Sequence, residues 1–110
     1  MSRESLDILL ARATDPASPY WSFWQLEGVD PSVEQLVEAR LNLQPCAAQT
    51  FSGAVGWTVH QVDADGTVFL RRRQQLDYNA VQGLIAEMIT FAHNYEGQFW
   101  SWMHGDGLGR

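Results

Sequence analysis

The side chains that most often perform catalysis are present in this sequence, but they are scattered along it. His60, His93 and His104 each lack a second ligand at a spacing that binds a metal ion. Ser101 lies between two tryptophans, without the glycines that expose a nucleophilic serine on a sharp turn. Glu87 has no paired carboxylate at a spacing suited to general acid–base work. The sequence therefore predicts no catalytic residue, no metal site and no cofactor, and it favours a binding protein over an enzyme.

Aromatic side chains and arginines are the better candidates for function. Five tryptophans, at positions 21, 24, 57, 100 and 102, are more than one small core ordinarily uses. For any single tryptophan, a core position is favoured over an interface by about two to one. We predict a partner-binding set made of Phe99, Trp100, Trp102, Trp24, Arg71 and Arg73.

The two arginines of that set come from Arg71-Arg72-Arg73, which is the only basic run. On a strand these side chains would alternate between the two faces of the sheet. The simpler interpretation is that they are solvated and pair with nearby carboxylates at a strand edge. The functional interpretation is a contact with an acidic patch or an RNA phosphate.

Length and composition favour one soluble domain. The chain has 110 residues, of which 45% are hydrophobic and 18% charged, as in ordinary globular proteins. No apolar run approaches the roughly 20 residues of a membrane span, and the N-terminus does not resemble a signal peptide. We therefore expect a cytoplasmic protein in which residues 1–14 form a helix, 15–19 a connector, 20–103 the body and 104–110 a flexible tail.

The charge is strongly acidic. Thirteen Asp and Glu residues face seven basic ones, all of them Arg, which gives a net charge of −6. Nucleic-acid affinity rests on clustered positive charge, so we expect no direct binding of nucleic acid. A protein partner with a basic surface is favoured instead. Cys46 is the only cysteine, so it can form no disulfide within the chain.

In the first half of the chain, the pattern predicts two helices that flank an aromatic strand. Ser2 or Ser5 caps a short helix that ends by Thr14, and residues 20–26 form the strand. Asp30-Pro31 then begins a second helix, which Pro45 ends. The buried side of this helix would hold Val33, Leu36, Val37, Ala39 and Leu41.

In the second half, a hairpin is followed by a long helix and a last strand. Residues 55–59 and 67–70 alternate with period two around Asp63-Ala64-Asp65-Gly66, while a separate strand over 46–52 is left open. Asp77 caps the long helix, and Gly97 is expected to end it in the left-handed conformation. Residues 98–103 form a strand with aromatic side chains on both faces. After the opening helix, the order predicts an α+β, ferredoxin-like βαββαβ antiparallel sheet with two helices on one face.

This order and the C-terminal residues resemble the RraB family, the protein regulators that inhibit ribonuclease E. Thr14-Asp15-Pro16 corresponds to the family's connector, and Phe99-Trp100-Ser101-Trp102 aligns with its Tyr-Asp-Gly-Trp strand. Trp100 replaces the Asp and Ser101 the Gly, and the acidic C-terminal tail of well-known members is missing. The resemblance implies a non-catalytic, cytoplasmic protein-binding domain, and the substitution at Trp100 indicates a changed partner.

The leading hypothesis is a small regulator that binds an enzyme, with a ribonuclease as the example that the resemblance suggests. An immunity or phage anti-defence protein, which neutralises a toxin or nuclease, is a second hypothesis, because complementary charge speeds the capture of a basic enzyme. A small-ligand-binding or enzymatic domain, with a pocket on the aromatic surface, is a third. A homodimer is left open by analogy with other sheets of this kind.

Overall fold

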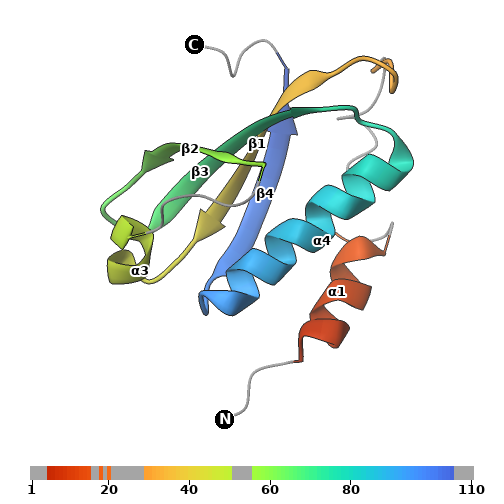
Figure 1. Ribbon diagram of the computed structural model, residues 1–110. Helices are drawn as coiled ribbons and strands as arrows, with labels where there is room; N and C mark the ends of the chain where they lie inside the picture. The colour runs from red at the N-terminus through yellow and green to blue at the C-terminus, as the bar shows by residue number, and fades with distance from the viewer. Residues whose placement is uncertain (1–4, 16–17, 19, 21–28, 51–55, 106–110) are drawn as a thin grey trace.

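The computed structural model describes residues 5–15, 18, 20, 29–50 and 56–105 of the chain. It is an α+β fold with a four-stranded antiparallel sheet, in which the strand order is β2-β3-β1-β4 (Figure 1). The elements in chain order are α1 (Leu6–Thr14), β1 (Gln35–Asn42), α3 (Pro45–Thr50), β2 (Thr58–Val62), β3 (Thr67–Gln74), α4 (Tyr78–Asn94) and β4 (Gln98–His104).

The predicted N-terminal helix is confirmed as α1. Of the two candidate caps, Ser5 is the one that the structure shows, and its hydroxyl accepts a hydrogen bond from the Ile8 N–H at 3.4 Å. Helix α1 packs against α4, and both helices lie on one face of the sheet (Figure 1). The apolar side of α1, with Leu6, Leu9 and Leu10, joins the same core as α4.

The second predicted helix is wrong, because residues 35–42 form the central strand β1. Val37, Ala39 and Leu41 are fully buried and alternate with polar residues, which is the period of a strand. The spacing of Val33, Leu36 and Val37 matches one face of a helix, which favoured the helix prediction. In the structure, however, Val33 is half exposed. Of the predicted first strand, residues 21–26 lie outside the described residues. The two helices that cover the sheet are therefore α1 and α4.

Pro45 begins a helix rather than ending one. Helix α3 starts at Pro45, where the missing N–H costs nothing because the first turn of a helix leaves its N–H groups unpaired. Ala48 of this short helix is fully buried in the common core. A separate strand over residues 46–52 was left open by the sequence, but this segment is helical as far as Thr50, and residues 51–55 lie outside the described part.

The predicted hairpin is confirmed as β2 and β3, which pair in antiparallel fashion, but its first strand spans Thr58–Val62 rather than residues 55–59. The turn closes with a hydrogen bond from the Asp63 N–H to the Thr67 carbonyl at 2.8 Å. Gly66 has a φ of +96°, a conformation that residues with a Cβ rarely adopt. Its carbonyl accepts the Leu43 N–H at 2.9 Å, so the turn also fixes the chain where β1 ends.

Helix α4 begins as predicted and ends differently. The Asp77 carboxylate accepts the Ala80 N–H at 2.8 Å, which confirms the N-cap. At the other end Glu96, not Gly97, takes the left-handed conformation, with a φ of +57°. The Glu96 N–H bonds the His93 carbonyl at 3.1 Å and the Gly97 N–H bonds the Ala92 carbonyl at 2.7 Å, which is a Schellman motif.

Gly97 is required for a different reason. A Cβ at this position would collide with the Asn42 carbonyl oxygen and lie 2.6 Å from Leu43 Cδ2. Glycine therefore lets the start of β4 approach the end of β1 closely. Among the described helices, none has the length and apolar character needed to cross a membrane.

Candidate protein-binding face

A β-bulge in β4 decides which of its aromatic side chains is exposed. Leu41 of β1 pairs with Phe99, but the neighbouring Arg40 pairs with Ser101, so Trp100 is an extra residue in β4. The two residues of a bulge face a single residue of the partner strand, which places Trp100 and Ser101 together opposite Arg40. Without the bulge, side chains would alternate strictly along β4, and Trp100 and Trp102 would point to the same face of the sheet.

Phe99 and Trp102 are core residues, in contrast to their predicted place in the partner-binding set. Phe99 is 4% exposed and Trp102 only 2% exposed, both on the side that the helices cover. Trp102 also donates its indole N–H to the Tyr20 carbonyl at 2.7 Å. We therefore remove both from the binding set. Trp100, which is 50% exposed, is retained, and Trp24 lies outside the described residues.

Opposite the helices, a buried carboxylate holds two arginines. Glu38 of β1 is 3% exposed and pairs with Arg71 of β3 and Met103 of β4 across the sheet. One Glu38 oxygen lies 3.1 Å from Arg40 Nε, and the other lies 3.1 Å from Arg71 Nε. The Arg40 guanidinium lies 5.2 Å from the centre of the Phe69 ring, a cation–π distance. Arg71 thus pairs with a carboxylate, as the simpler interpretation expected, but it does so on the inner strand β3 with a side chain that is 17% exposed, rather than solvated at a strand edge.

Arg73 and Trp100 lie on the same side of the sheet as this cluster. Arg73 is two residues after Arg71 on β3 and is exposed, and its Nη2 lies 3.4 Å from the Glu34 carbonyl oxygen. We call Glu38, Arg40, Arg71, Arg73 and Trp100 the arginine face. Sequence reasoning missed Glu38 and Arg40, because the helix predicted from Asp30-Pro31 to Pro45 concealed their alternation with the buried residues of β1.

Arg72 points to the other side, as the predicted alternation requires. Its guanidinium lies 4.2 Å from the centre of the Trp57 ring, and its Nη1 forms a 3.0 Å ion pair with Glu87. Trp57 donates its indole N–H to the same Glu87 carboxylate at 2.9 Å. Because every group in this cluster has a partner, we interpret the cluster as a structural contact that holds β3 against α4. The cluster accounts for Trp57 and Glu87 without assigning them a function.

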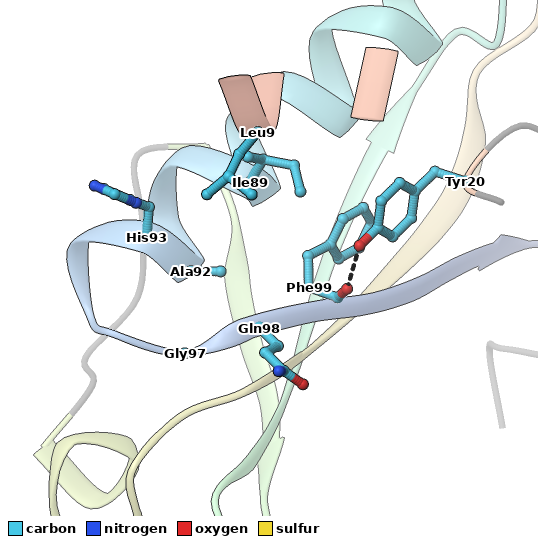
Figure 2. Close-up of a pocket in the computed structure, with 8 residues that line it drawn as sticks. All are labelled: Leu9, Tyr20, Ile89, Ala92, His93, Gly97, Gln98 and Phe99. Carbon is cyan, nitrogen blue, oxygen red and sulfur yellow. Dashed lines mark hydrogen bonds between the residues drawn. The ribbon is translucent and has the colours of Figure 1, made fainter. Parts of the chain in front are cut away.

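A cavity of about 390 Å³ lies where α1, α4 and β4 meet. Figure 2 shows Leu9 of α1 beside Ile89 of α4, while Tyr20 and Phe99 stack below them and His93 points away. The two rings are nearly parallel, with centroids 4.5 Å apart, and the Tyr20 hydroxyl donates to the Phe99 carbonyl at 2.7 Å. The lining therefore combines apolar side chains with polar groups in similar measure, and Gln98, His93 and the Tyr20 hydroxyl are polar groups among the described lining.

Burial raises the pKa of Tyr20 above its usual value of 10.0. A group with a raised pKa in the folded state contributes stability below its unfolded pKa, and this contribution is lost as the pH rises further. We expect urea unfolding to show lower stability at a pH above 10 than at pH 8. In Tyr20→Phe this alkaline loss should be smaller. Equal losses in the two proteins would contradict the assignment to Tyr20.

The described residues do not assemble a metal site. Within residues 5–15, 18, 20, 29–50 and 56–105, no group of three or more His, Cys, Asp or Glu side chains is placed to hold a metal ion. No family model matches this chain, and no curated protein matches it. The resemblance to inhibitors of ribonuclease E therefore stays a prediction.

Proposed function

We propose that this protein is a non-catalytic regulator that binds another protein through the arginine face. The observation that carries the proposal is the bulge in β4, which exposes Trp100 on the side of the sheet that holds three arginines. Tryptophan and arginine are the side chains most enriched among residues that dominate binding energy at protein interfaces. An indole that is 50% exposed still has a large apolar area to bury against a partner.

The ferredoxin-like topology predicted from the sequence is part of this proposal. Counted from the edge at β4, the order of strands in the sheet is β4-β1-β3-β2. Along the chain, the described elements from β1 onward are β1, α3, β2, β3, α4 and β4. This order supports a ferredoxin-like body that begins at β1. Together with the predicted resemblance, it favours a cytoplasmic regulator of an enzyme such as a ribonuclease. An immunity or anti-defence protein would use the same face against a toxin or nuclease.

The net charge and the arginine face act at different distances. A charge of −6 attracts a basic protein during diffusional encounter, which favours a partner with a basic surface. At contact, the arginines of the face would meet acidic or aromatic groups of the same partner. A partner with a basic surface and an acidic segment satisfies both requirements.

Site-specific cross-linking tests the proposed face. A photoreactive benzoylphenylalanine at position 100 is expected to capture a defined protein in cells, whereas the same group at position 78 should not. Tyr78 is a matched control because it is 54% exposed and lies at the start of α4. The captured protein is then purified, and Trp100→Ala should weaken its binding by roughly tenfold or more. Identical adducts at both positions, or an unchanged affinity, would contradict the proposal.

The cavity beside Tyr20 favours a small-ligand-binding domain as a second candidate. Its volume of about 390 Å³ lies within the range of ligand pockets, and its lining combines apolar side chains with a few polar groups. Thermal-shift screening of apolar metabolites would reveal stabilising ligands. A substitution that fills the cavity, Ala92→Leu, should abolish such a shift. No stabilising compound, or a shift that survives in this variant, would leave the cavity without a role in binding.

A further inference from the structure

We infer that Arg40 and Arg71 form a carboxylate-binding pair, which takes the acidic side chains of a partner's peptide segment. This inference rests on the proposed function, because it names the chemistry that the arginine face would recognise. It goes beyond that function by assigning the contact to two guanidinium groups. Three properties of the pair carry it: their orientation, their charge and their surroundings.

Glu38 orients both guanidinium groups in the same manner. Each of its two oxygens accepts one Nε–H, from Arg40 on one side and from Arg71 on the other, at 3.1 Å. A guanidinium that is held through Nε keeps its two Nη groups as donors for another acceptor. Arg40 uses one Nη for a 3.5 Å contact with the Met103 sulfur, a weak acceptor. No described residue accepts a hydrogen bond from either Nη of Arg71.

The charge of the cluster is incompletely balanced. Glu38 supplies a single negative charge to two guanidinium groups, and exposed Arg73 adds a third positive charge on the same strand face. The described strand residues that share this face include no other Asp or Glu. An excess of positive charge thus gathers in a protein whose net charge is −6. A second carboxylate at the Nη groups would reduce the repulsion between the two cations.

The surroundings favour a peptide over a nucleic acid. Nucleic acids carry charge along their whole length, and a protein with a charge of −6 repels such a polyanion beyond the immediate contact. A short acidic segment needs only the local patch, where a guanidinium can bind one carboxylate through two hydrogen bonds. Trp100 and Phe69 provide apolar surface on the same sheet face for the uncharged residues of the segment.

Calorimetric titration of the full chain at low salt tests this inference. The probe is a short peptide of alternating Glu and Leu with blocked ends, compared with the same peptide carrying Lys for Glu and with an oligoadenylate of similar length. We expect the Glu peptide to bind and the Lys peptide not to bind. Added salt should weaken the complex, because screening acts on exposed charges. Failure of the Glu peptide to bind, or tighter binding of the oligoadenylate, would overturn the inference.

Variants of Arg71 test whether the carboxylate-binding pair makes the contact with the Glu peptide. Arg71→Ala is expected to weaken binding of the Glu peptide about tenfold, as the loss of a charge-assisted hydrogen-bond pair predicts. Arg71→Lys keeps the charge but lacks the planar fork, so it should also bind less tightly than the native protein. Arg12→Gln, on α1 at the other face, is the control with an equal loss of charge and should bind normally.

Unfolding curves of each variant show whether the fold is retained. Equal affinities for native protein and Arg71→Lys would mean that charge alone acts, which overturns the assigned geometry. A negative peptide result leaves the cross-linking at position 100 as a separate measurement. The carboxylate-binding pair and the proposed protein-binding face can therefore fail independently.

Discussion

Replacing Trp102 with alanine is expected to lower the free energy of unfolding by about 4 kcal/mol, as for other large aromatic residues in cores. The side chain is 2% exposed, so its removal leaves a cavity between the sheet and the helices. The substitution also leaves the Tyr20 carbonyl without the indole N–H that it accepts at 2.7 Å. Urea unfolding followed by circular dichroism measures the difference.

Trp100→Ala is the matched control for this prediction. The two tryptophans are separated by one residue on the same strand, but Trp100 is 50% exposed. We expect its replacement to change the free energy of unfolding by about 0.5 kcal/mol or less, as for ordinary surface substitutions. Comparable losses of unfolding free energy in the two variants would mean that the bulge does not expose Trp100 while Trp102 stays buried. The basis for the arginine face would then be removed.

Replacing Gly66 with alanine is expected to lower the free energy of unfolding by about 3 kcal/mol. A Cβ at this position would collide with the Leu43 carbonyl oxygen, a backbone atom that cannot move aside without displacing the end of β1. The φ of +96° adds strain for any residue with a Cβ. The hydrogen bond from the Leu43 N–H to the Gly66 carbonyl would be disturbed as well. Thermal and urea unfolding both report this loss.

Gly83→Ala provides a control in which the same chemical change has the opposite sign. Gly83 lies inside α4, and an added Cβ meets no atom within 4 Å. Alanine in a helix interior is favoured over glycine by about 1 kcal/mol, so this variant should be more stable than the native protein. Destabilisation by both substitutions would contradict the explanation from close backbone contact at Gly66.

The elements that the sequence predicted correctly are those whose signals are local. Ser5 and Asp77 cap their helices through side-chain oxygens that reach the first turn. The Asp-Gly pair in the turn between β2 and β3 supplies the backbone conformations of a tight reversal. The buried face of α4 follows from its spacing of three and four residues. In each case the determining atoms lie within a few residues along the chain.

The central strand β1 shows where local reasoning failed. Residues 33–41 contain apolar side chains at spacings that fit a helix as well as a strand. The choice depends on partners elsewhere in the chain, because β1 gains its backbone hydrogen bonds from β3 and β4. With β1 assigned as a helix, Glu38 and Arg40 could not be placed beside Arg71. The candidate site was therefore only partly predicted, through Trp100, Arg71 and Arg73.

By itself, the sequence determined that this chain builds a mixed α+β domain. It also determined that the last third is a capped helix followed by an aromatic strand, and that Arg71 and Arg72 point to opposite faces of the sheet. Only the tertiary structure decided which tryptophan of that strand is exposed. The extra residue at position 100 is defined by the register between Arg40 and Leu41 of the neighbouring strand. Register is set by pairing between distant segments and reverses the face of every residue beyond a bulge, so it cannot be obtained from alternation within β4 alone.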